Sequence, residues 1–204
     1  MVVVLLLGVA CTLGTFALLR SPERAEPAVA IFPLPQEYEG SYGNDWGAAR
    51  LQGKHEGTDV FAPEGTPIFS ITDGTVSRAW GSSGDGWNTL GGYTVMIEAS
   101  EDVGPIQRGD RLYYAHMDAP TTLGSGASVE AGQRIGTVGD TGQGPKGTRG
   151  KFEPHLHLGW YEGWNFFGED RVSSMNGAMN PYPLLRSIQR GEFQIENEKD
   201  QGPS

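Results

Sequence analysis

Cysteine is almost missing from this chain of 204 residues: Cys11 is the single one, and it lies in an uncharged N-terminal run. One cysteine excludes an intrachain disulfide and a cysteine-based zinc site, so any bound metal must be held by histidine and carboxylate. Basic residues are scarce too, with 15 Lys and Arg against 25 Asp and Glu and a net charge of −10. No basic stripe appears, which argues against nucleic acid as a partner.

The chain is rich in residues that make turns, with 31 glycines and 13 prolines. This composition disfavours long helices and favours short strands between tight turns. Stretches rich in β-branched and aromatic residues lie at 58–61, 67–71, 75–80, 93–98, 111–117, 133–138 and 155–160. Their close spacing predicts an all-β fold, an antiparallel β-sandwich or barrel.

Composition also predicts how the chain is divided. Residues 1–19 carry no charge and approach the ~20 apolar residues that span a bilayer, so we predict a transmembrane anchor or a signal segment there. Arg20 and Arg24 follow this segment and would favour the cytoplasm for what comes next, which is in tension with export. We predict a proline-rich linker at 20–37, a folded domain at 38–185 and a polar tail at 186–204.

Histidine is rare, and all four copies lie in short polar motifs. His155 and His157 are two apart on a predicted strand, so both imidazoles face the same side. His55 and Asp59 also share a side if their segment is extended. Catalytic zinc sites use three such ligands and keep one position open for water. His55, Asp59 and one histidine of the pair at 155 and 157 make this set, and strand geometry alone allows either one.

The two histidines that remain, His116 among them, would be free for proton transfer or for stabilising an oxyanion. Zinc polarises a carbonyl and lowers the pKa of bound water. Together these groups predict amide hydrolysis.

In the motifs around these residues the chain strongly resembles the M23 peptidases, the lysostaphin-type and LytM-type zinc endopeptidases of peptidoglycan. The resemblance covers about residues 42–162. The matching motifs are His55-Glu56-Gly57-Thr58-Asp59, Tyr114-Ala115-His116, Pro154-His155-Leu156-His157, Ala62-Pro63-Glu64-Gly65-Thr66-Pro67, Asp73-Gly74-Thr75-Val76, Ala131-Gly132-Gln133-Arg134-Ile135-Gly136 and Gly139-Asp140-Thr141-Gly142.

The resemblance implies one zinc ion per chain, held by His55, Asp59 and His157, with catalytic roles for His116 and His155. It implies a β fold of the duplicated hybrid motif type, with a groove walled by loops 81–92 and 140–151. It also implies peptidoglycan as substrate and an extracytoplasmic location in a bacterial cell envelope, membrane-anchored or secreted.

Three further expectations concern side chains around the site. Lys146, Arg149 and Lys151 form a basic cluster that is either a site for substrate carboxylates or a solvated loop. Of Tyr113 and Tyr114, only one can face the site, because neighbours on a strand point to opposite faces. The tryptophans can line the groove, although such side chains more often pack in a core. They are Trp80, Trp87, Trp160 and Trp164.

Two other functions remain open. A catalytically silent LytM-like domain would bind the cell wall or activate an amidase, but such domains lack ligands and here each ligand position is filled. A phosphocarrier with a related β fold would use two histidines as a phosphoryl relay; Asp59 and the apolar N-terminal segment disfavour it.

Overall fold

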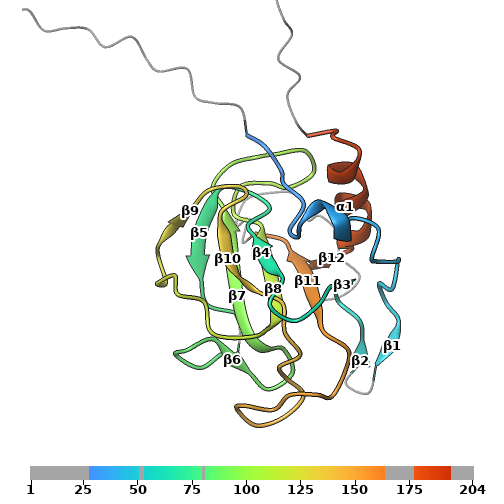
Figure 1. The fold of residues 1–204 in the computed structure, drawn as a ribbon. Helices are drawn as coiled ribbons and strands as arrows, with labels where there is room; N and C mark the ends of the chain where they lie inside the picture. The colour runs from blue at the N-terminus through green and yellow to red at the C-terminus, as the bar shows by residue number, and fades with distance from the viewer. Residues whose placement is uncertain (1–27, 51–52, 80, 164–176, 194–204) are drawn as a thin grey trace, which may run out of the picture.

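The computed structural model describes residues 28–50, 53–79, 81–163 and 177–193, drawn as coloured ribbon in Figure 1. Its elements are the 3-10 helix η1 (Gln36–Tyr38), the strands β1 (Ala49–Arg50), β2 (Gly53–Lys54), β3 (Thr58–Phe61), β4 (Pro67–Phe69), β5 (Gly74–Ser77), β6 (Trp87–Asn88), β7 (Gly92–Ala99), β8 (Arg111–Met117), β9 (Ser128–Val129), β10 (Arg134–Thr137), β11 (His155–Tyr161) and β12 (Ala178–Met179), and the helix α1 (Pro181–Gln189).

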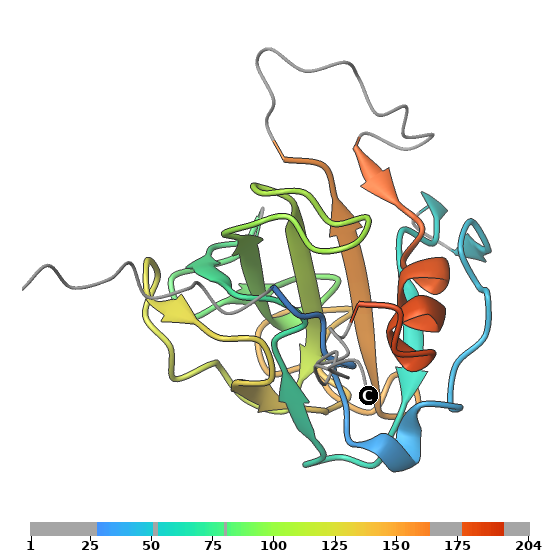
Figure 2. The same ribbon diagram turned by 90° about the horizontal axis from the view of Figure 1, so that it is seen from above.

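One large antiparallel sheet dominates the fold. Its strand order is β12-β11-β8-β7-β5-β9, with β3 also paired to β11 and β6 to β7. The two-stranded sheets β4–β10 and β1–β2 complete the β structure of the described residues. Figure 2, seen from above, shows α1 beside β3 and β11. The antiparallel all-β class is confirmed, and each predicted strand is found within a few residues of its expected range. The duplicated hybrid topology stays a prediction.

The long strands β8 and β11 are buried along most of their length. Along β8, Leu112 and Tyr114 are fully buried, and Leu156 and Leu158 of β11 pack in the same core cluster. The Tyr114 hydroxyl accepts a hydrogen bond from the backbone N–H of Ile71 at 2.9 Å. Such a bond offsets the cost of burying the phenol oxygen.

The folded part begins earlier than the sequence predicts. Ala30, Phe32 and Leu34 lie within the predicted linker, yet all three are buried in the main core. The backbone of this segment also pairs with the body, since Ile31 N–H donates to Ile71 O at 2.8 Å. Residues 28–37 are therefore part of the domain: apolar residues alternate between the prolines and point inward, a pattern that the prolines obscured.

The C-terminal boundary also differs from the prediction. Helix α1 runs across the expected boundary at residue 185 and buries Leu184, Leu185 and Ile188. Asn180 caps it, because its side-chain oxygen accepts from Tyr182 N–H at 2.9 Å. The start of the predicted polar tail is thus helical and packed.

Some predictions fall on other parts of the chain. The segment 1–19 lies outside the described residues, so the anchor or signal there stays a prediction. Among the residues that the structure describes, no helix has the length and apolar character to cross a membrane.

Candidate metal centre

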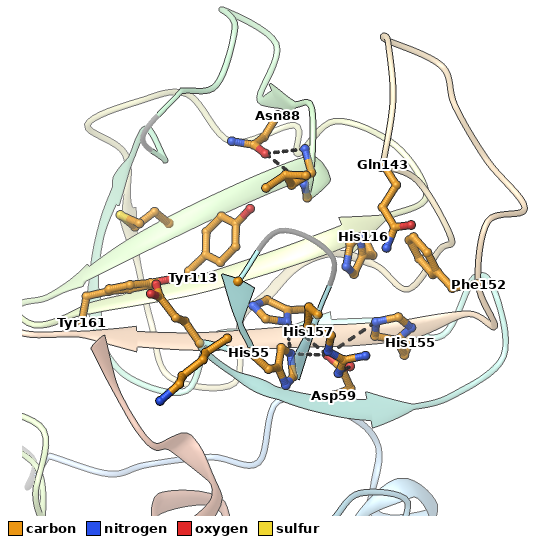
Figure 3. Close-up of a pocket in the computed structure, with 17 residues that line it drawn as sticks. His55, Asp59, Asn88, Tyr113, His116, Gln143, Phe152, His155, His157 and Tyr161 are labelled. Atoms are coloured by element: carbon orange, nitrogen blue, oxygen red, sulfur yellow. Dashed lines mark hydrogen bonds and ion pairs between the residues drawn. The ribbon is translucent and has the colours of Figure 1, made fainter. Parts of the chain in front are cut away.

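Strand pairing brings the predicted site residues together. Strand β11 lies between β3 and β8, and its register sets His157 opposite Asp59 on one side and opposite Ala115 on the other. His116 follows Ala115 on β8, and His55 lies between β2 and β3. Three separate regions of the chain therefore meet at the middle strand, as Figure 3 shows.

His55, Asp59 and His157 form a compact triangle of possible ligand atoms. His55 Nε2 lies 2.9 Å from His157 Nδ1 and 3.1 Å from Asp59 Oδ1, and the latter two atoms are also 3.1 Å apart. Zinc bonds of 2.0–2.1 Å in a tetrahedron require ligand atoms about 3.3 Å apart. The triangle is therefore close to the size that one zinc ion needs, and its donor set of two imidazoles and one carboxylate suits zinc.

The electrostatics of the triangle favour a cation. Burial raises the pKa of Asp59, but hydrogen bonds with His157 and His55 outweigh burial and hold this pKa well below its usual range. Burial lowers the pKa of His55, but hydrogen bonds to Asp45 and Asp59 outweigh it and raise the pKa to about 9. Asp59 as carboxylate and His55 as imidazolium therefore stabilise each other, and a metal ion that binds here replaces the proton on His55 Nε2.

His116 and His155 lie beside the triangle, with their rings 4.8 Å apart between centroids. Each ring donates from Nδ1 to a backbone carbonyl, His116 to Thr141 O at 2.8 Å and His155 to Glu153 O at 2.7 Å. These acceptors place the Nδ1 proton, so Nε2 of each ring keeps its lone pair. His155 Nε2 lies 3.5 Å from Asp59 Oδ1, at the edge of the triangle.

Burial lowers the pKa of His116 to about 3, with smaller contributions from the nearby His157 and His155. Burial likewise lowers the pKa of His155. Both rings are therefore neutral at pH 7.

Two residues beside the site have a backbone conformation that favours glycine. His116 has a φ of 59° and Gln143 a φ of 54°, and they are the two non-glycine residues with positive φ in the described ranges. The His116 backbone is held there by its N–H, which donates to Gly91 O at 2.7 Å. Such conformations cost free energy and persist where the surroundings fix them, as at functional sites.

The site opens into a cavity of about 440 Å³ lined by 17 residues, among them all five predicted metal-binding and catalytic residues. Asn88 and Leu90 come from the loop at 81–92, and Gln143 comes from the loop at 140–151. The two loops are joined by backbone bonds, including Gln143 N–H to Leu90 O at 3.1 Å. Both loops that the resemblance implies as groove walls therefore border the cavity.

Phe152 and Phe61 pack on His116 and His155, the two histidines outside the triangle. The Phe152 ring lies 4.4 Å from that of His116, and the Phe61 ring lies 5.4 Å from that of His155, between centroids. These aromatic contacts restrict how each imidazole can turn.

The predicted basic cluster does not line this cavity. Lys146 pairs with Asp85, and Arg149 pairs with Glu64, Asp118 and Asp140. Arg149 therefore ties the loop to neighbouring segments, and a role of the cluster in substrate binding stays a prediction. Trp87 and Trp160 are buried outside the cavity, while Trp80 and Trp164 lie outside the described residues.

Other cavity residues escaped the sequence analysis. Arg50, Tyr161 and Phe152 all line the cavity, and Tyr113 is the member of its tyrosine pair that does so. Burial raises the pKa of Tyr161 to about 12, so its hydroxyl keeps its proton at neutral pH. Their side chains depend on tertiary contacts for their position, and no local motif marks them.

Solved structures of known proteins are similar to this one. The structure is similar to a lytM-type crystal structure from Ruminococcus gnavus, with a TM-score of 0.60 and 35% identity over 80% of this chain and 61% of that one. It is also similar to the catalytic domain of lysostaphin from Staphylococcus simulans, with a TM-score of 0.52 and 27% identity over 76% of this chain and 99% of that domain.

Similar relatives are found by sequence as well. The chain is 38% identical over 172 residues to the L-Ala–D-Glu endopeptidase of Bacillus subtilis, covering 80% of this chain and 45% of the relative. It is 30% identical over 152 residues to the glycyl-glycine endopeptidase ALE-1 of Staphylococcus capitis, covering 74% of this chain and 34% of the relative. The chain thus spans less than half the length of these two relatives.

The antiparallel sheet and its His–Asp–His cluster define a β-sheet protein with a candidate metal centre. Residues 53–170 match the model of peptidase family M23, which is more than half of the chain. The chain belongs to peptidase family M23.

Proposed function

We propose that this chain is a zinc-dependent endopeptidase that hydrolyses a peptide bond in peptidoglycan. The observation that carries the proposal is the triangle of His55 Nε2, Asp59 Oδ1 and His157 Nδ1, with two neutral imidazoles beside it. Zinc held by these three atoms would supply Lewis-acid chemistry and lower the pKa of a water. A catalytically silent domain would not need His116 and His155, whose Nδ1 atoms are bonded to backbone carbonyls so that Nε2 keeps its lone pair.

The chain's own groups then handle protons. Nε2 of His155 or His116 accepts a proton from the attacking water, while the Nδ1 proton of each ring stays on its backbone carbonyl. The same imidazole, now protonated, can return that proton to the leaving amine. The positive charge of an imidazolium at this position also stabilises the oxyanion. The two rings therefore have the geometry for general base and general acid.

The proposed substrate follows from the relatives. The relative with 38% identity is named an L-Ala–D-Glu endopeptidase, which favours a bond in the peptidoglycan stem peptide over a glycine bridge. Peptidoglycan lies outside the cytoplasmic membrane, so we propose an extracytoplasmic location. Anchoring through residues 1–19 is part of the same proposal.

The test combines zinc content with digestion of purified peptidoglycan. Wild-type protein should bind one zinc and release peptide fragments, and a chelator should abolish the release until zinc is added back. His157→Ala should lose the metal, and His155→Ala should keep the metal and lose activity. A wild type that binds zinc yet releases no fragments would favour the silent-domain alternative.

A further inference from the structure

Asp45 contacts the outer nitrogen of a proposed zinc ligand. His55 Nε2 faces the triangle, and His55 Nδ1 lies 3.1 Å from Asp45 Oδ2 and 3.2 Å from the Asp45 backbone oxygen. Both atoms of Asp45 are acceptors, so Nδ1 carries a proton and Nε2 is the nitrogen left for a metal. The tautomer of His55 is therefore set by one residue ten positions earlier.

The backbone holds Asp45 in that place. The N–H of Gly47 donates to His55 O at 2.9 Å, and the N–H of His55 donates to Ala48 O at 2.9 Å. Ala48 N–H in turn donates to Asp45 O at 3.1 Å. The turn at 45–48 is thus bonded to the same residue whose ring Asp45 contacts, and the two cannot separate without losing these bonds.

Arg50 links Asp45 to a second proposed ligand. Its Nη2 lies 2.8 Å from Asp59 Oδ2 and 3.4 Å from Asp45 Oδ2. Asp59 Oδ2 is the oxygen that does not belong to the triangle, so Arg50 leaves Oδ1 directed at the other ligand atoms. Asp45 and Arg50 therefore connect His55 and Asp59 through atoms that are not part of the triangle.

We propose that Asp45 is a positioning residue that presets His55 for zinc, with Arg50 extending the same network to Asp59. This inference rests on the proposed zinc site. Ligating histidines commonly donate their second nitrogen to a carboxylate, which fixes ring orientation and raises ligand basicity. Removing such an outer partner typically weakens metal affinity about 10- to 100-fold.

The experiment measures zinc affinity of the purified protein by competition with a chelator. Asp45→Ala should bind zinc about 10- to 100-fold more weakly than wild type. Asp45→Asn keeps an acceptor near Nδ1 but lacks the charge, so its affinity should lie between the two. Asp102→Ala is the control, because Asp102 also accepts a hydrogen bond in a loop, from Arg108 N–H, but lies away from the cavity; its zinc affinity should match wild type.

Two further readouts separate positioning from a structural role. The melting temperature of metal-free Asp45→Asn should match that of wild type, and its kcat should recover at saturating zinc with KM unchanged. Wild-type zinc affinity in both Asp45 variants would overturn the inference, and so would a loss of affinity explained by unfolding of metal-free Asp45→Asn. Because affinity is measured without substrate, inactive wild-type protein would overturn the proposed function and leave this test intact.

Discussion

Gly57 lies between His55 and Asp59, and the His157 ring occupies the space where its side chain would be. A Cβ built on Gly57 would lie 2.4 Å from His157 Cε1, 2.7 Å from His157 Nε2 and 2.6 Å from Leu158 O. Carbon atoms pack at about 3.5–4.0 Å, so Gly57→Ala overlaps the ring by more than 1 Å. The Leu158 carbonyl belongs to β11 and cannot move far, because β11 is paired on both sides.

To relieve both overlaps, the His157 ring must turn and the backbone at Gly57 must shift away from Leu158 O, and the turn of the ring displaces Nδ1 from the triangle. Metal–ligand distances tolerate changes of about 0.2 Å, so a displacement near 1 Å removes one of three ligands. We expect zinc affinity to fall by at least about 100-fold, more than loss of an outer partner causes. Overpacking should cost about 1–3 kcal/mol of folding free energy, which leaves the domain folded.

The assay is zinc titration of Gly57→Ala against a chelator, with peptidoglycan digestion at saturating zinc. Gly124→Ala is the matched control, since a Cβ at Gly124 meets no heavy atom within 4 Å. It should keep both zinc affinity and activity. If Gly57→Ala binds zinc as tightly as wild type, the ring does not need its observed position, and the reasoning is refuted.

Two other predictions concern apolar residues. Phe61 and Leu90 are the exposed large hydrophobic side chains of the described residues, and they lie beside His155 and in the cavity lining respectively. We expect Leu90→Ala to raise KM for peptidoglycan peptides about 3- to 10-fold by removing apolar contact area, with zinc content unchanged; an unaltered KM would exclude Leu90 from the substrate site. Phe61 lies outside the cavity lining and packs on His155, so Phe61→Ala should lower kcat instead. Phe32→Ala should cost about 3–5 kcal/mol, because Phe32 is buried in the core, and should lower the melting temperature by roughly 10 °C. Leu90→Ala serves as the exposed control, and equal melting temperatures for the two variants would show that residues 28–37 are not integral to the domain.

Strand positions were predictable because they depend on local patterns, whereas the members of the His55–Asp59–His157 triangle were predicted as a set only through the resemblance to M23 peptidases. Alternation and glycine turns marked β3, β7, β8 and β11 within a residue or two. The spacing of His155 and His157 correctly predicted that both imidazoles face one side, since a strand has a period of two.

Charge pairing across the chain was not predictable. The basic cluster at 146–151 looked available for substrate, but Arg149 meets Glu64 and Asp118, which lie 85 and 31 residues away. No local pattern tells which acid a given arginine will meet. Asp45 and Arg50 escaped for the same reason: their relation to the site depends on a turn and a hairpin bonded beside His55.

The H-x-H motif raises the question of how two identical side chains on one face perform different tasks. The answer lies in which ring nitrogen faces the cluster. His155 uses Nδ1 for the Glu153 carbonyl and directs only Nε2 at Asp59, at 3.5 Å. His157 instead directs Nδ1 at both His55 and Asp59, at 2.9 and 3.1 Å. Strand geometry allows either histidine to hold zinc, whereas the shorter and double approach of Nδ1 favours His157. Gly57 leaves room for the Cε1–Nε2 edge of the His157 ring, so the glycine within the His55–Asp59 motif is needed for this orientation.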